Sequence, residues 1–241
     1  MVDIEEKRML NEISNYWLHR KFEAYPFKIK WYNNAVKPIF HLPYADDTLA
    51  FIVLSVPGMF DTTFVPFIRN NQSEIIKDPI DNCMVHEFNK FIEAFPSHEI
   101  VVFHDFDLDV KRKARVLVQT AGHVAGAAYF TKRATVHPRY GGWFGFRGVI
   151  ILKDVMFPNL RQNEPVDSVP FREKKIELLE KFNFQWRDSS YRDVVPVAHR
   201  YSEEEKLYFD TLPKDRCKLI DKWRWNNGIM RNLVIWLWIR M

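Results

Sequence analysis

The sequence predicts an α+β fold, in which a mostly antiparallel sheet is flanked by helices. Strand patterns and helix patterns are mixed at irregular intervals along the 241 residues. A continuous apolar run at 48–56, TLAFIVLSV, is typical of a strand that is covered on both faces. The chain has no internal repeat and no low-complexity segment. We therefore expect one main domain at 1–215, followed by a C-terminal extension at 216–241 that is either a packed helix or an exposed partner patch.

The N-terminal elements follow from hydrophobic spacing. An apolar stripe over 3–22 predicts a first helix. Alternation over 25–36, ending at two asparagines, predicts a strand, and the strand at 48–56 follows it. Asp61 is then expected to cap a helix that carries Phe64, Phe67 and Ile68. The next helix is predicted at 82–95, with these side chains inward: Met84, Phe88, Phe91 and Ile92.

A strand that turns acidic is predicted at 99–110. It contains His104, Asp105, Asp107 and Asp109. In a strand the three aspartates share one face and His104 points the other way. A divalent metal site is one interpretation, and a solvated end of the strand is the one we favour.

Six of the eight glycines lie between 115 and 152. Small residues dominate a predicted helix over 115–132, and at helical spacing Gly122 and Gly126 share a face that allows close approach. A glycine turn and a long strand are predicted over 136–155. This strand carries Arg147 among hydrophobic residues, so the region indicates either a roomy cleft with a cationic floor or simply a tightly packed helix on a sheet.

Two helices are predicted in the C-terminal third. The first follows at 172–186 with these residues inward: Ile176, Leu178, Leu179 and Phe182. The second, at 202–212, opens with a capping-box pattern from Ser202 to Glu205.

Composition limits the function classes. The 35 basic and 31 acidic residues give a net charge of +4, which is too small to indicate a nucleic-acid-binding protein. The two cysteines form neither a CxxC motif nor a disulfide framework, which favours a reducing compartment. We find no signal-peptide pattern, and the apolar C-terminal end is too short to span a bilayer. The expectation is a soluble, cytoplasmic protein without a membrane partner.

Few residues point to chemistry directly. The chain has no P-loop, GxGxxG, GxSxG or HExxH motif. His123 lies in the string GHVAG, but Ala121 stands where an aspartate would orient a metal-bound imidazole, so we favour a packed, hydrogen-bonded histidine. Arg147 and Arg192 are the sharper candidates. They either form internal ion pairs with carboxylates such as Asp188 or Asp193, or meet in one cleft and hold a small diacid.

Several strings resemble one known family. HVAGAAYF, HPRYGGWFGFRG, FNFQWRDSSYRD, HLPYADDTLAFIVLS and DPIDNC are similar to segments of the cobalamin-trafficking CblC (MMACHC) family, over about Phe22 to Pro213. The resemblance implies a nitroreductase-like fold that binds cobalamin with its benzimidazole tail detached from cobalt. It implies removal of the upper axial ligand, by alkyl transfer to glutathione or by reductive loss of cyanide with a reduced flavin, FMN or FAD.

The resemblance also implies site residues and partners. Arg147 and Arg192 are expected to bind the glutathione carboxylates and orient its sulfur. The cobalamin contacts carried over are Asp105, Val116, Leu117, Val118, Gln119, Phe130, Thr131, Lys132, Thr135 and Phe146, with His123 supporting the pocket. Cobalt is held by the corrin, so no protein metal ligand is expected. Implied protein partners are the cobalamin D type trafficking protein and methionine synthase. The alternatives are a cobalamin carrier with little turnover and, ranked last, a plain flavin reductase.

Overall fold

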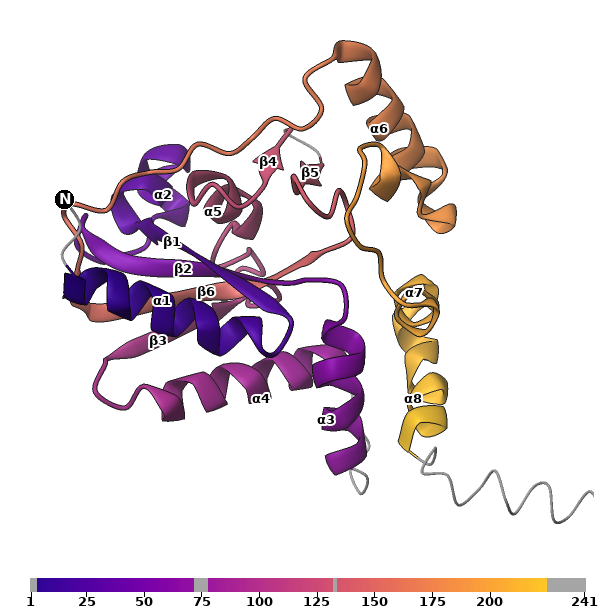
Figure 1. The fold of residues 1–241 in the computed structure, drawn as a ribbon, viewed down its shortest axis with the longest axis horizontal. Coiled ribbons are helices and arrows are strands. Elements are labelled where there is room, and N and C mark those ends of the chain that lie inside the picture. The colour runs from indigo at the N-terminus through magenta and orange to yellow at the C-terminus, as the bar shows by residue number, and fades with distance from the viewer. Residues whose placement is uncertain (1–3, 72–77, 132–133, 225–241) are drawn as a thin grey trace, which may run out of the picture.

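A four-stranded antiparallel sheet lies at the centre of the computed structural model, which describes residues 4–71, 78–131 and 134–224 (Figure 1). In spatial order the strands are β1 (Phe22–Lys28), β2 (Thr48–Ser55), β6 (Gly145–Met156) and β3 (Ile100–His104). Every neighbouring pair is antiparallel. The predicted α+β class is therefore confirmed.

Helices cover both faces of this sheet (Figure 1). One face packs against α1 (Ile4–Leu18), α3 (Val65–Asn70) and α4 (Pro79–Ala94), and the other against α2 (Ile29–Ala35) and α5 (Val118–Val124). Side chains of β2 alternate between the two cores, since Leu49, Phe51 and Val53 face the first, while Ala50, Ile52 and Leu54 face the second. This strand is buried on both faces, as its continuous apolar run predicts.

Two predictions in the N-terminal half are wrong. The expected strand at 25–36 is divided between the end of β1 and the short helix α2, because Ile29 and Tyr32 at helical spacing both enter the second core. Asp61 does not cap a helix. It lies inside a π-helical turn, η2 (Phe60–Phe64), which runs directly into α3. The helix expected at 82–95 begins earlier, at Pro79, whose missing N–H is tolerated in a first turn.

The glycine-rich region is more divided than its pattern suggests. The helix expected over 115–132 is only α5, because Gly126 takes a φ of +74° and turns the chain. A small two-stranded sheet, β4 (Tyr129–Phe130) with β5 (Thr135–Val136), follows it. The strand expected at 136–155 is split by the turn at Gly141, and only β6 is long. The strand expected at 99–110 ends at His104.

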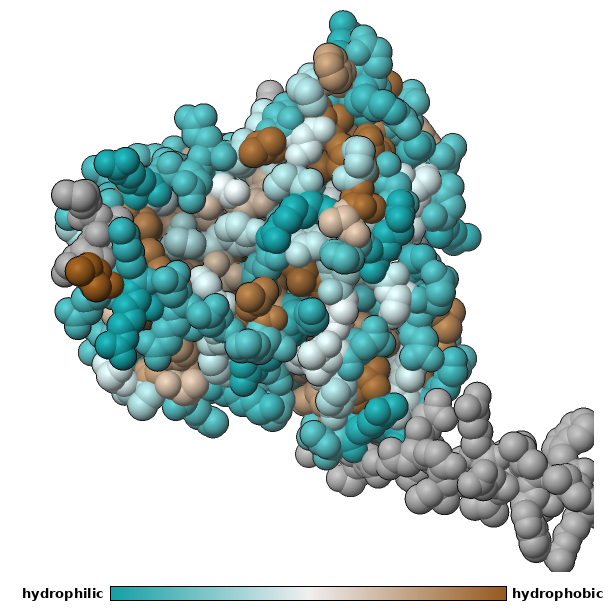
Figure 2. Space-filling view, viewed as in Figure 1, coloured by the Kyte–Doolittle hydropathy of each residue, from teal (hydrophilic) through white to brown (hydrophobic). Residues whose placement is uncertain are grey.

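The C-terminal third forms a layer at one end of the sheet (Figure 1). It contains α6 (Arg172–Phe184), the 3₁₀ turns η3 (Trp186–Asp188) and η4 (Ser190–Asp193), then α7 (Glu203–Asp210) and α8 (Arg216–Arg224). Of the inward residues predicted for α6, Leu178 is buried, but Ile176 and Phe182 are exposed. Figure 2 shows hydrophobic side chains among hydrophilic ones in this part of the surface.

The last described helix, α8, belongs to the first core. Its side chains Ile220 and Trp223 are buried, and the Trp223 ring centroid lies 5.0 Å from that of Phe60. The rest of the predicted C-terminal extension, 225–241, lies outside the described residues. No helix in the described ranges combines the length and apolarity that crossing a bilayer requires.

Candidate functional site

An apolar hollow opens between the end of the sheet and α6. This cavity has a volume of about 250 Å³. Its walls come from α5, β5, the start of β6, α6 and η4, and the residues are Gln119, Ala134, Thr135, Val136, Gly142, Phe144, Phe146, Leu178, Phe182, Tyr191, Arg192, Val194 and Val195. Aromatic and aliphatic side chains dominate, so a planar apolar group suits this cavity.

A second cavity of about 290 Å³, the arginine hollow, adjoins the first. It is lined by Asp105, Val118, Gln119, Phe144, Gly145, Phe146, Arg147, Arg192, Tyr201 and Phe209. The two hollows share Gln119, Phe144, Phe146 and Arg192. The rings of Phe144 and Phe146, in edge-to-face contact at 5.2 Å, form the wall between them. A ligand in one hollow therefore lies directly beside a ligand in the other.

Glycine at position 122 makes this wall possible. A Cβ atom built there would lie 2.4 Å and 2.5 Å from two ring atoms of Phe146. The small helix face noted in the sequence thus receives the aromatic ring that separates the two hollows. The tight-packing interpretation and the cleft interpretation of this segment are both correct, because the packed ring is itself a wall of the cleft.

Arg147 is fixed in the central strand β6. Only 8% of its surface is exposed, and its Nε donates a hydrogen bond of 2.8 Å to Oγ of Ser55 on β2. The guanidinium carbon lies 5.7 Å from the ring centroid of Phe209. Among the described residues no carboxylate lies within 4.0 Å of it. Its charge thus faces the arginine hollow without a paired anion.

Arg192, in the turn η4, reaches the hollow from the opposite side. Its Nη1 donates a hydrogen bond to the carbonyl oxygen of Gly142, and its guanidinium lies 5.1–5.3 Å from the centroids of three rings, those of Trp143, Tyr191 and Tyr201. Its Nε is buried and has no hydrogen-bond acceptor in the ranges that the structure describes. Cation–π contact holds the group in place without neutralising it.

The internal ion-pair interpretation is wrong for both arginines. Asp193 accepts hydrogen bonds from Arg200 and from the Trp143 indole, at 2.9 Å and 2.7 Å. Asp188 accepts from the backbone amide of Ser190. Both aspartates are therefore engaged elsewhere, and the structure brings Arg147 and Arg192 to one cavity as the diacid interpretation requires.

The acidic run after β3 does not have the geometry of a metal site. Asp107 accepts a hydrogen bond from the backbone amide of His104, and Asp109 accepts from the amides of Lys111 and Lys113. These carboxylates organise turns, so the expected common strand face does not exist. Among the described residues no cluster of three His, Cys, Asp or Glu side chains could hold an ion.

Asp105, by contrast, lines the arginine hollow. Its backbone amide, just after the end of β3, donates to the carbonyl oxygen of Arg147 on β6 at 3.3 Å. The residue as a whole is exposed, but neighbouring protein atoms partly desolvate its carboxyl. This desolvation raises its pKa to about 6, although the nearby Arg147 charge lowers it.

The residues expected to contact cobalamin fall into two groups. Five line one or both hollows, namely Asp105, Val118, Gln119, Thr135 and Phe146. The remaining described residues line neither, and they are Val116, Leu117, Phe130 and Thr131. Of these, Val116 is buried in the second core, the Leu117 amide donates to the Tyr32 hydroxyl, and Phe130 pairs with Thr135 in the small sheet. Lys132 lies outside the described residues.

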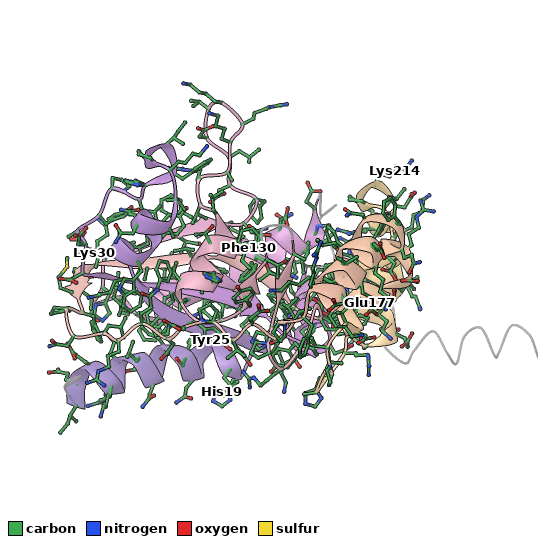
Figure 3. All side chains as sticks on the ribbon, turned by 90° about the horizontal axis from the view of Figure 1, so that it is seen from above. His19, Tyr25, Lys30, Phe130, Glu177 and Lys214 are labelled. Carbon is green, nitrogen blue, oxygen red and sulfur yellow. The ribbon has the colours of Figure 1, made fainter. Side chains whose placement is uncertain are left out.

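His123 has the features of a packed helix histidine. Its Nδ1 accepts a hydrogen bond of 3.2 Å from the backbone amide of Phe130, and its ring makes an edge contact with Tyr129. Burial lowers its pKa, so the imidazole is neutral near pH 7. This bond connects α5 to β4, beside the apolar hollow. Figure 3 labels Phe130, together with Tyr25 on β1 and Glu177 on α6.

A buried polar network supports the turn at Gly141 and Gly142, to which Arg192 is hydrogen-bonded. Glu23 accepts hydrogen bonds from Tyr25, Arg139 and Tyr140, at 2.6–2.8 Å. His137 accepts from the amides of Arg139 and Tyr140 through Nδ1, so its Nε2–H donates to the Tyr25 hydroxyl at 3.2 Å. Burial lowers the pKa of His137 to about 4. The neutral ring keeps the segment before Gly142 in place.

Sequence reasoning missed the aromatic residues that hold the arginines. Tyr201 and Phe209 precede and end α7, more than fifty residues from Arg147, and their ring centroids lie 5.6 Å apart. Phe209 belongs to the helix and Tyr201 precedes its cap, and a sequence gives no sign of which partner these rings meet. Trp143 lies in HPRYGGWFGFRG, one of the strings that resemble the family, but no nearby residue indicates its contact with Arg192.

Comparisons with known proteins agree on one family. The sequence model of the methylmalonic aciduria and homocystinuria type C family matches residues 21–220. A chicken (Gallus gallus) protein named cyanocobalamin reductase / alkylcobalamin dealkylase is 46% identical over 214 residues, which cover 83% of this chain and 90% of the relative. The human protein of the same name is 43% identical, with 83% and 76% covered.

A solved structure is also similar. The crystal structure of a Caenorhabditis elegans B12-trafficking protein CblC, described as a human MMACHC homologue, superimposes with a TM-score of 0.83 at 28% sequence identity. The match covers 93% of this chain and 99% of the other.

Proposed function

The chain belongs to the methylmalonic aciduria and homocystinuria type C family, and from that premise we propose that it binds cobalamin and removes its upper axial ligand. Alkyl groups leave by transfer to glutathione, and cyanide leaves after reduction of cobalt. The names of the relatives, cyanocobalamin reductase and alkylcobalamin dealkylase, support both activities. The observation that carries the proposal is the pair of adjoining hollows, one apolar and one with two arginines that lack carboxylate partners among the described residues.

The apolar hollow suits the detached benzimidazole tail of cobalamin. Phe144, Phe146 and Phe182 offer ring faces to a planar heterocycle, while Gln119 and Thr135 offer polar atoms at the edge. His123 is committed to the amide of Phe130 and so does not replace the lost nitrogen donor. Cobalt without a lower donor has less electron density and is reduced more readily. Tail capture therefore prepares the metal for both reactions.

In dealkylation the sulfur of glutathione attacks the alkyl carbon opposite cobalt. The new bond is S–C, the broken bond is Co–C, and its electron pair stays on cobalt, which leaves as cobalt(I) with a thioether as the other product. We assign the two glutathione carboxylates to Arg147 and Arg192. Fixing the tripeptide at both ends removes much of the entropic cost of alignment, an effect that reaches several kcal/mol in well-oriented reactions.

The same arginines favour ionisation of the thiol. A free cysteine thiol has a pKa of about 8.5, so only a few per cent is thiolate at neutral pH. Two guanidinium groups that lack paired carboxylates stabilise negative charge close by, which lowers the thiol pKa and raises the reactive fraction. Their positive charge thus serves both binding and activation.

Decyanation requires one electron from a donor, after which cobalt(II) releases cyanide. A reduced flavin, FMN or FAD, supplies this electron when it is bound. The aromatic wall of Phe144 and Phe146 fits a planar ring system, and Arg192, which lines both hollows, offers a cation for a flavin phosphate. These residues would orient the flavin ring beside the cobalamin.

Location and partners complete the proposal. We place the reaction in the cytoplasm, and the absence of a disulfide between Cys83 and Cys217 is compatible with a reducing compartment. Transfer of the product to a cobalamin D type trafficking protein and to methionine synthase belongs to the same proposal. A carrier function is the second candidate, because α6 and its flanks expose apolar side chains such as Phe171 and Phe184, 70% and 83% exposed.

A single-turnover assay with methylcobalamin and glutathione tests the proposal. Arg147→Gln should retain cobalamin binding, seen as a shift of the cobalamin absorbance spectrum, but should slow demethylation by about tenfold or more at subsaturating glutathione. Arg161→Gln, which removes an exposed arginine outside both hollows, is the matched control. Unchanged turnover in Arg147→Gln would refute the assigned role. Tight cobalamin binding without turnover in the wild type would leave the carrier function.

A further inference from the structure

Glu205 is an unexplained buried acid beside the arginine hollow. Its side chain is completely buried, and neither carboxylate oxygen has a hydrogen-bond donor in normal geometry within the described part of the chain. The amide of Gly58 lies near enough to favour the ionised form slightly. Unpartnered buried carboxyl groups are rare, because desolvation without a hydrogen bond costs free energy. A stable protein that retains one has a reason for it.

Only one of the two hydrogen bonds of a capping box is made between Ser202 and Glu205. In a capping box the side chain at this position reaches back to the start of the helix. Here the Ser202 hydroxyl does accept a hydrogen bond from the Glu205 amide at 3.3 Å, as predicted, but the Glu205 carboxyl turns inward instead. The helix start is capped by Ser202 alone.

The inward direction places the carboxyl behind the arginines. Glu205 and Phe209 are spaced by four on one side of α7, and Tyr201 directly precedes the Ser202 cap of this helix. Tyr201 and Phe209 are the rings on which Arg192 and Arg147 rest, at 5.2 Å and 5.7 Å. Glu205 therefore lies between the two supports of the cationic pair, without an ion pair to either arginine within 4.0 Å.

Among the described residues, the charged groups that act on Glu205 come from several elements. Arg147 comes from β6, Arg192 from η4, and Asp61 from η2, while Tyr201 is a neighbour on its own segment. Burial raises the pKa of Glu205 to about 8, against the lowering effect of Arg147; Asp61 raises it further and Arg192 lowers it. Near neutral pH the carboxyl is thus mainly protonated and uncharged.

We propose that Glu205 is a positioning residue that sets the net charge of the arginine pair available to glutathione. As a neutral acid it leaves both guanidinium charges to the two carboxylates of the ligand. As an anion it attracts the guanidinium groups toward α7 and repels the ligand. This inference rests on the proposed function, since it assumes that the arginine hollow binds glutathione.

Thermodynamic linkage between ligand binding and ionisation of Glu205 makes the proposal measurable. If an ionised Glu205 weakens ligand binding, then the ligand must in turn disfavour ionisation of Glu205 by the same factor. Binding near pH 8 should therefore take up protons from the buffer. A coupling of ordinary size corresponds to an affinity change of about 5-fold to 150-fold between the two protonation states.

Isothermal titration calorimetry with S-methylglutathione tests this directly, because that probe has both carboxylates and no ionisable thiol. Titrations at pH 8 in two buffers of different ionisation enthalpy give the number of protons taken up. The wild type should take up a fraction of a proton, and Glu205→Gln should take up less by that fraction. Between pH 7 and pH 9 the wild-type affinity should fall by about 3-fold to 10-fold relative to that of Glu205→Gln.

The matched control is Glu203→Gln, which removes an exposed glutamate of the same helix. This variant should keep the wild-type proton uptake and pH profile. Equal uptake and equal pH profiles in wild type and Glu205→Gln would overturn the inference while leaving the proposed function intact. No binding of S-methylglutathione by the wild type, or binding unaffected by Arg147→Gln, would instead refute the assignment of the hollow to glutathione.

Discussion

Gly122→Ala is the most informative single change, because two effects of opposite sign compete at one atom. Replacing glycine by alanine inside a helix normally stabilises a protein by about 0.5–1 kcal/mol. The added methyl group here would lie 2.4 Å from the Phe146 ring, whereas ordinary contact begins near 3.4 Å. The ring must therefore retreat by about 1 Å.

The overlap should win this competition. Phe146 lies at the edge-to-face contact with Phe144 and close to β2, so its ring cannot move without disturbing the wall between the hollows. Overpacking of this kind costs about 1–3 kcal/mol. We expect a net loss of about 1–2 kcal/mol in the free energy of unfolding, together with weaker cobalamin binding.

Urea unfolding and absorbance titration with cobalamin measure the two effects. Adding Phe146→Leu to Gly122→Ala should relieve the clash, so the double variant should be more stable than the sum of the single changes predicts, by about 1 kcal/mol. Thr120→Ala, on the same helix, controls for substitution in α5. If Gly122→Ala proves more stable than wild type and binds cobalamin equally well, our account of the wall fails.

Three other results are expected. For Arg192→Gln, as for Arg147→Gln, glutathione saturation kinetics should show a raised KM with cobalamin affinity retained. An unchanged KM would contradict the assignment of a glutathione carboxylate to Arg192. The pKa of His137 is lowered from 6.5 to about 4, so the unfolded state binds protons first and stability should fall between about pH 6.5 and pH 4 by up to about 3 kcal/mol. Urea unfolding at pH 7 and pH 5 checks this: about 2 kcal/mol of the loss falls in this interval, and the pH dependence of His137→Asn should be smaller by that amount. Trp223→Ala should lower the free energy of unfolding by about 3–5 kcal/mol, since the ring is buried against Phe60; a change below 1 kcal/mol would show that α8 is not part of the core.

Much of the fold could be predicted from hydrophobic spacing alone. The run at 48–56 indicated a strand covered on both faces, and the stripe of α1 and the Ser202 cap of α7 were equally local signals. The boundaries of α2 and α5 could not be predicted from local sequence, because tertiary contacts set them. The strand pattern at 25–36 stops at Ile29 because a helix places Ile29 and Tyr32 in the core, and α5 ends where Gly126 approaches Asn163.

The site was predictable only in part for the same reason. Arg147 is conspicuous because a charge among hydrophobic residues requires a partner or a ligand, and that signal lies within its own strand. Its supports do not. Phe209 and Ser55 come from distant segments, and the inward turn of Glu205 contradicts the local capping pattern, so tertiary contacts decided these positions.

The two arginines differ in how firmly they are held, and this difference sets which thiols fit. Arg147 belongs to a strand with neighbours on both sides and is bonded to Ser55, so its guanidinium has one position. Arg192 is held in a four-residue turn by one carbonyl oxygen and three ring faces, an arrangement that tolerates sliding. Tripeptide analogues lengthened at the carboxylate that meets Arg192 should remain substrates, whereas the same extension at the Arg147 end should abolish turnover.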